Sequence, residues 1–99
     1  MKKFHILCLF AMVSLMACQK TEHKVRVKNN YATQLNVTVG PAAFGVVTSG
    51  STTDYKVVNE GANPLSGDIT GTLTVDGSGK HNWTMTIGSD AKFTVAEDK

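Results

Sequence analysis

Residues 69–87 read ITGTLTVDGSGKHNWTMTI, in which apolar and polar side chains alternate on both sides of a break at Asp76–Gly79. Strict alternation is typical of a β-strand with one buried face, and a short run of Asp, Gly and Ser is typical of a turn. The stretch therefore predicts a β-hairpin. Its apolar faces should bring Trp83 close to Leu73 or Val75, as part of the core.

The same period-two pattern continues outward through the chain. Further short alternating segments, broken by Gly, Asn, Asp and Pro, lie at residues 24–28, 34–39, 44–47, 55–57 and 93–95. None of this part of the chain carries the 3.6-residue apolar stripe of a helix. We therefore predict an all-β fold, a single small antiparallel β-sandwich of about seven short strands that occupies residues 23–99.

One segment of this domain carries a resemblance to known folds. The stretch Gly50–Tyr55, followed by Val57, Val58 and Gly61, resembles the strand–turn pattern of small immunoglobulin-like and transthyretin-like sandwiches, which are common in bacterial envelope proteins. The resemblance implies two packed sheets. Such folds host many unrelated functions, so it implies no particular activity.

The N-terminal segment has a different character. Lys2 and Lys3 precede a run from Ile6 to Ala17 that is apolar apart from Ser14. Because a helix that spans a membrane needs about 20 apolar residues, this shorter run is typical of a cleaved signal peptide.

Leu15, Ala17 and Cys18 end that run, and they resemble the lipobox of bacterial lipoprotein precursors. The resemblance implies cleavage after Ala17 and lipid attachment at Cys18. We thus expect a lipoprotein signal peptide at residues 1–17, a lipidated Cys and short tether at residues 18–22, and a membrane partner through the lipid anchor. Gln19, in place of the Asp that often retains lipoprotein at the inner membrane, favours the bacterial outer membrane. The periplasmic face and the cell surface remain alternatives.

Cleavage would also change the charge balance. The chain carries ten Lys and Arg against eight Asp and Glu, and the loss of Lys2 and Lys3 leaves eight of each. A neutral domain gives no general attraction to nucleic acid, which we exclude as a partner. Cys8 would leave with the signal peptide and Cys18 would carry lipid, so the domain should contain no disulfide.

Two surfaces are candidates for binding. The hairpin would align threonines on one solvent face as a possible glycan-binding ladder: Thr70, Thr72, Thr74, Thr84 and Thr86. Exposed strands also favour Thr on propensity alone. Lys24, Arg26 and Lys28 form a basic stripe with two compatible interpretations, protection of an edge strand from pairing and contact with lipid headgroups.

Chemistry-bearing motifs are sparse. Only His23 and His81 remain in the domain, and a zinc site usually takes three or four protein ligands. No nucleophile elbow or phosphate-binding loop is present in the sequence. We expect no metal, no cofactor, no catalytic residue and no enzymatic activity.

Three functions remain open. The first is an outer-membrane-anchored, non-enzymatic binding or adhesion-type module with an envelope protein or glycan as its partner. The second is a structural or accessory subunit of an envelope complex. The third is a glycan-binding module that uses the threonine face.

Overall fold

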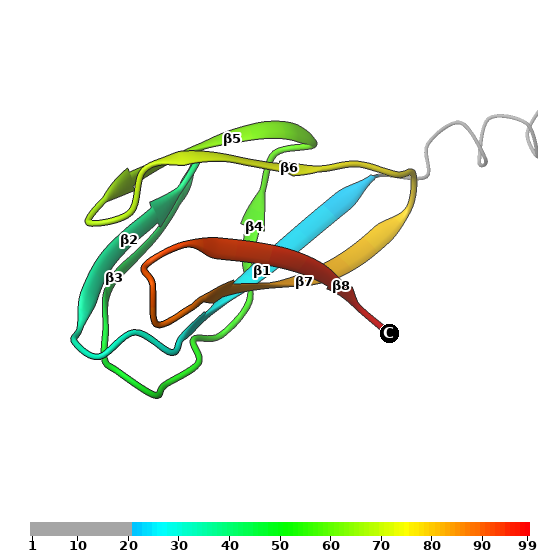
Figure 1. Ribbon diagram of the computed structural model, residues 1–99. Helices are drawn as coiled ribbons and strands as arrows, with labels where there is room; N and C mark the ends of the chain where they lie inside the picture. The colour runs from blue at the N-terminus through cyan, green and yellow to red at the C-terminus, as the bar shows by residue number, and fades with distance from the viewer. Residues whose placement is uncertain (1–20) are drawn as a thin grey trace, which may run out of the picture.

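The computed structural model describes residues 21–99, which form two four-stranded β-sheets packed face to face (Figure 1). Eight strands follow one another along the chain: β1 (Glu22–Asn29), β2 (Leu35–Val39), β3 (Ala42–Val47), β4 (Lys56–Val58), β5 (Gly61–Gly67), β6 (Gly71–Val75), β7 (Lys80–Ile87) and β8 (Phe93–Asp98). Sheet A has the order β4-β1-β7-β8, and sheet B has the order β3-β2-β5-β6. The predicted all-β sandwich is confirmed, with eight strands in place of about seven.

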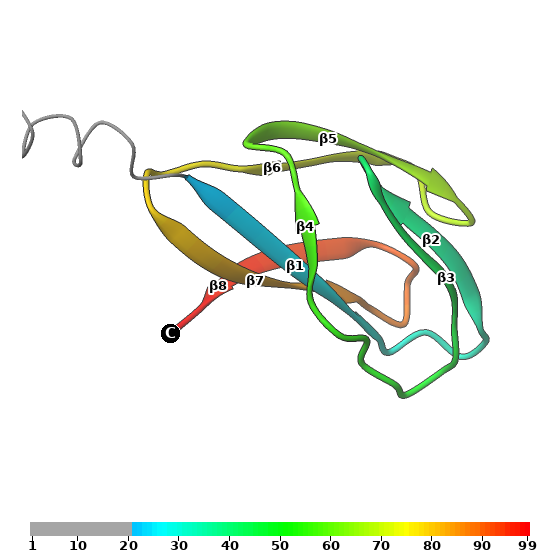
Figure 2. The same ribbon diagram turned by 180° about the vertical axis from the view of Figure 1, so that it is seen from behind.

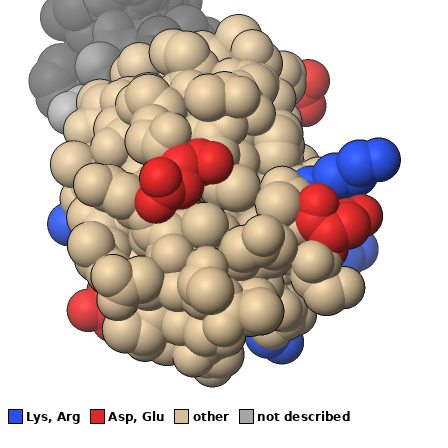
Figure 3. All heavy atoms as spheres, turned by 60° about the vertical axis from the view of Figure 1, so that its left-hand side comes forward, with Lys and Arg blue, Asp and Glu red and all other residues tan. Residues whose placement is uncertain are grey.

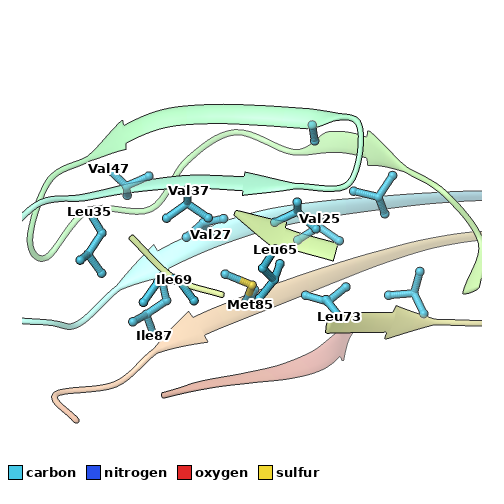
Figure 4. Close-up of a cluster of buried hydrophobic side chains, with 14 residues drawn as sticks. Val25, Val27, Leu35, Val37, Val47, Leu65, Ile69, Leu73, Met85 and Ile87 are labelled. Atoms are coloured by element: carbon cyan, nitrogen blue, oxygen red, sulfur yellow. The ribbon is translucent and has the colours of Figure 1, made fainter. Parts of the chain in front are cut away.

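The core lies between the sheets and is made mainly by alternate residues of the strands, to which Ile69 of the β5–β6 connection is added (Figure 4). Its buried members are Val25, Val27, Leu35, Val37, Val39, Ala42, Val47, Val58, Leu65, Ile69, Leu73, Val75, Met85 and Ile87. Full burial of a Val, Leu, Ile or Met side chain contributes about 1.5–3 kcal/mol to folding. This single apolar layer is therefore the main source of stability.

The predicted hairpin is wrong. β6 belongs to sheet B and β7 to sheet A, so Asp76–Gly79 crosses from one sheet to the other. β7 pairs in parallel with β1 instead, in register from Glu22↔Lys80 to Asn29↔Ile87, while every other strand pair in residues 21–99 is antiparallel. Gly79 takes the left-handed backbone conformation (φ 88°) that redirects the chain, and its carbonyl accepts a hydrogen bond from Glu22 N at 3.0 Å.

The pattern of buried residues survives this change of partner. Leu73 and Val75 reach the core from sheet B, and the half-buried Trp83 packs against the same core from sheet A. The sequence therefore predicts the inward faces of β6 and β7 correctly but pairs the strands wrongly.

β5 is the strand that the sequence pattern missed, because Asn63-Pro64 resembles a turn. Proline has no N–H to donate, but β5 tolerates Pro64 because the paired part of β2 ends at Val39. Beyond that point only the Pro64 carbonyl forms a hydrogen bond, which it accepts from Gly40 N at 2.8 Å. The buried Asn63 side chain closes the β4–β5 connection, accepting from Asn59 N at 3.0 Å and donating to Asn59 O at 2.8 Å. Seen from behind, β4 leads from sheet A into β5 of sheet B (Figure 2).

Asn29 ties the two sheets together at the far end of β1. Its side chain is fully buried, and its Nδ2 donates to Val47 O at 2.9 Å and to Thr33 O at 3.0 Å. Its Oδ1 accepts from Tyr31 N at 2.8 Å. Because a buried polar group that loses its partner costs about 1–3 kcal/mol, these three bonds make Asn29 a structural residue.

We predict that Asn29→Ala lowers the free energy of unfolding by about 2–3 kcal/mol, since it leaves backbone groups of Thr33, Tyr31 and Val47 without their partner. Urea unfolding measures the change. The exposed Asn82 of β7 supplies the control, because Asn82→Ala should change stability by less than about 0.5 kcal/mol. An equal loss in both variants would contradict the role of Asn29.

Candidate functional site

The lipidation site lies outside the described residues. This applies to Cys18, the predicted lipid-bearing residue, and to Ala17, the predicted cleavage position, so both stay predictions. In residues 21–99, no helix has the length and the apolar character needed to cross a membrane.

The predicted threonine ladder does not form. Thr72 and Thr74 are exposed on β6 of sheet B, whereas Thr84 and Thr86 point outward from β7 of sheet A. The outer faces of two packed sheets point in opposite directions, so these residues cannot bind one ligand together. Thr70 is exposed before β6 begins. The error follows directly from the wrong hairpin.

The basic residues also occupy a different place from the one expected. Lys24, Arg26 and Lys28 lie on β1, which is flanked by β4 and β7, so they do not protect an edge strand. They project from the outer face of sheet A, where Lys24 and Arg26 are half-buried and Lys28 is exposed. Contact of this stripe with lipid headgroups stays a prediction.

Arg26 belongs to a polar network that crosses β1, β7 and β8 of sheet A and includes Tyr55, which precedes β4. Its Nε donates to Thr84 Oγ1 at 3.0 Å and lies 3.7 Å from Asp98 Oδ2, while its guanidinium carbon lies 5.0 Å from the centre of the Tyr55 ring. Tyr55 OH and Thr84 Oγ1 both donate to the Asp98 carboxylate. Hydrogen bonds from Tyr55 and Thr84, with the positive charge of Arg26, lower the pKa of Asp98, and the bond to Asp98 raises the pKa of Tyr55.

A cluster of ring side chains lies at the start of β1. Trp83 Nε1 donates to His23 Nδ1 at 3.0 Å, so the proton of the neutral His23 ring sits on Nε2. This Nε2 is buried without a hydrogen-bond partner in residues 21–99 and lies 3.4 Å from Glu60 Oε1. The His81 ring stacks on His23 with centroids 5.4 Å apart.

Both nitrogens of His81 have acceptors. Nδ1 lies 2.5 Å from Glu97 Oε2, and Nε2 lies 2.7 Å from Ser78 O. These two bonds, with Glu97 first, raise the pKa of His81 from its ordinary value. The cluster ties together β1, β7, β8 and the turn before β7, and in the part of the chain described no three His, Cys, Asp or Glu gather as metal ligands.

The outer face of sheet B is the surface that sequence reasoning missed. Its outward side chains are short or apolar and none is charged: Asn36, Thr38, Ala43, Val46, Ala62, Pro64, Ser66, Thr72 and Thr74. We call this set the neutral face. Val46 is 57% exposed, although it is a large apolar residue.

The signal for this face is present in the sequence. Residues 29–53 contain no Lys, Arg, Asp, Glu or His, and Asp68 is the only charged residue in 61–75. Asp68 is occupied locally, because its Oδ2 accepts from Asn36 N at 2.7 Å. Figure 3, which brings the side of β2 and β3 forward, shows a surface with few charged groups. The charged residues gather instead on sheet A and in the connecting turns.

We predict that Glu97→Gln lowers the pKa of His81 toward 6.5, because it removes the carboxylate that stabilises the imidazolium. A raised pKa means that the ion pair stabilises the fold at low pH and that this contribution is lost as pH rises through the His81 pKa. Histidine ring NMR titration gives the midpoint directly. Glu60→Gln should lower it less, and an unchanged midpoint in Glu97→Gln would contradict the assignment.

Comparison with known proteins identifies a solved structure with a similar fold. No protein-family model matches the chain, and no curated protein matches it. Among solved structures, the N-terminal domain of AlgF from P. aeruginosa is similar, with a TM-score of 0.62 over 83% of this chain and 99% of that chain. The sequence identity of 20% supports a shared fold alone. The protein is therefore a small two-sheet β domain that resembles the N-terminal domain of AlgF.

Proposed function

We propose that the protein is a non-enzymatic accessory subunit of a cell-envelope complex, held at the outer membrane by lipid on Cys18 and docked on a partner protein through the neutral face. The observation that carries the proposal is the unequal distribution of charged residues between the outer faces of the two sheets. Sheet A bears Lys24, Arg26, Lys28 and Asp98 on its outer face, and the outward residues of sheet B bear no charge.

The physical reason is the cost of burying charge. An ion removed from water without a partner is strongly destabilising, and the centres of protein interfaces are accordingly depleted of charged residues. The neutral face can be covered without this cost. Its side chains are also short, so little rotamer entropy is lost when a partner covers them.

A protein partner suits this surface better than a glycan. Small-molecule sites generally combine apolar or aromatic walls with a few convergent polar groups. The neutral face contains no aromatic residue, and the threonines of β6 and β7 are divided between opposite faces of the sandwich.

A subunit is also favoured over a free-standing adhesion module. The candidate surface is a sheet face with its backbone fixed by four paired strands, and not a set of variable end loops. The similar fold is one domain of AlgF, and use as a part of a larger chain supports a module that works beside other domains.

The lipid anchor has its own test. We expect Cys18→Ser to abolish incorporation of radiolabelled palmitate and to release the protein from the membrane fraction, because the thiol that carries the lipid is gone. Cys8→Ser is the matched control and should leave labelling and fractionation unchanged. Palmitate on the Cys18→Ser chain would contradict the lipoprotein proposal.

Docking through the neutral face is tested with two matched substitutions. Ala43 lies on the neutral face and Ala96 on β8 of sheet A, and both are exposed strand residues. In chemically cross-linked membranes, Ala43→Lys should reduce capture of a stoichiometric partner by at least about tenfold, which corresponds to about 1.4 kcal/mol. Ala96→Lys should leave capture unchanged. If the two variants behave alike, the neutral face is not the docking surface.

A further inference from the structure

β6 is an edge strand without the charge, proline or bulge that usually protects such a strand from pairing. Within residues 21–99 the four edges of the two sheets are β3, β6, β4 and β8. β6 consists of Gly71–Val75, contains no charge and no proline, and pairs with β5 in an unbroken register. Edge strands of this kind readily accept another strand, and proteins usually block them.

The other three edges are blocked. β3 pairs with β2 through a register shift at Val37/Thr38, and the nearby Gly45 has a φ of 71°. β4 is only three residues long and begins with Lys56. β8 ends in Glu97 and Asp98. Bulges, short length and charge are the devices that discourage edge pairing, so β6 stands apart from its counterparts.

The alternation of hydrogen-bonded and non-hydrogen-bonded pairs between β5 and β6 shows which backbone groups of β6 point toward its open edge. Pro64 uses its carbonyl toward Gly40, on the β2 side of β5, so Pro64↔Thr72 is a pair of the type that exchanges no hydrogen bonds. The N–H and C=O of Thr72 must then point away from β5, toward the open edge. Thr74 lies two residues further along and presents its groups in the same direction.

The sequence of this edge is self-complementary. Thr72-Leu73-Thr74 reads the same in both directions, so antiparallel pairing about a two-fold axis at Leu73 places Thr72 opposite Thr74 of a second copy. Both pairs are then in hydrogen-bonded phase, with four backbone hydrogen bonds in all. Thr–Thr cross-strand pairs on the outer face add to the stability of such a ladder.

We propose that a second copy of this chain pairs with the protein through β6, antiparallel and centred on Leu73, to form one continuous eight-stranded sheet from two copies of sheet B. No charged side chain lies within the paired strands, so no like charges meet at the axis. This pairing uses the edge of sheet B and goes beyond the docking proposed for its neutral face.

The register is tested by disulfide cross-linking of the full chain in membranes. Thr72→Cys and Thr74→Cys are made in separate chains with different tags and are co-expressed. In the proposed dimer these positions face each other with Cα atoms about 5.5 Å apart, within the range of a disulfide. Mild oxidation should therefore give a disulfide-linked dimer that carries both tags.

Each cysteine variant expressed alone is the control. Two copies of the same variant place their cysteines on the diagonal of the ladder, with Cα atoms more than about 7 Å apart, so cross-linking should fall at least fivefold. Cross-linking no greater in the mixed pair than in the single variants would overturn the proposal. If a strand of another protein occupied β6, the mixed pair would also show no increase in cross-linking, and the proposal would be overturned.

A second measurement does not depend on cysteine. Thr74→Pro removes only an N–H that faces the open edge, so the domain should keep its urea unfolding midpoint while the detergent-solubilised chain changes from dimer to monomer in sedimentation. Thr74→Val keeps the N–H and should remain a dimer. A monomeric wild-type chain, or a folded Thr74→Pro chain that stays dimeric, would overturn the pairing through β6.

Discussion

The parallel pairing of β1 with β7 is the constraint on which the rest of the fold depends. Parallel strands cannot be joined by a tight hairpin and need a long crossover connection. Here the crossover is residues 30–79, which contain all of sheet B together with β4. Sheet B is therefore held in place by the strands that precede and follow it in the chain. Such long-range pairing also implies slower folding than a chain of local hairpins would show.

Because of this topology, the charged and the uncharged segments of the sequence lie in different sheets, so that they form opposite outer faces of the sandwich. The strands that precede and follow the crossover, β1, β7 and β8, build most of sheet A and carry Lys24, Arg26, His81 and Asp98. The crossover contains no charged residue from residue 30 to residue 53. One outer face thus holds a network of ionic and hydroxyl groups, while the opposite face keeps only short neutral side chains.

Period-two patterning was enough to predict the fold class and the inward residues of most strands, because burial of alternate side chains is a local property of each strand. The prediction was wrong in β4, where the pattern placed Tyr55 and Val57 on the apolar face, whereas Val58 is buried and Val57 is 52% exposed. The pattern was not enough to predict partners. Leu73 and Met85 face the core whether β6 and β7 form a hairpin or lie in opposite sheets, so the pattern cannot distinguish the two arrangements. The threonine ladder and the edge position of Arg26 failed for the same reason. β5 was not predicted because Pro64 normally argues against a strand, and the sequence does not show that β2 ends before it reaches this proline. The neutral face was visible as an uncharged stretch, but only the topology shows that this stretch forms one surface.

The neutral face and the open edge of β6 are continuous, because Thr72 and Thr74 belong to both. Uncharged, flat sheet surface with a bare edge is an aggregation hazard for any small domain, and a lone charge at either threonine would remove the hazard at little cost to the fold. The other three edges are blocked, so the absence of such a charge on β6 supports the proposal that this surface is covered in the working protein. Attachment to a membrane would make that covering specific, since anchored copies meet in a restricted set of orientations. In the two proposals made above, the same lack of charge would serve both the pairing of two copies at the edge and the docking of a partner on the face.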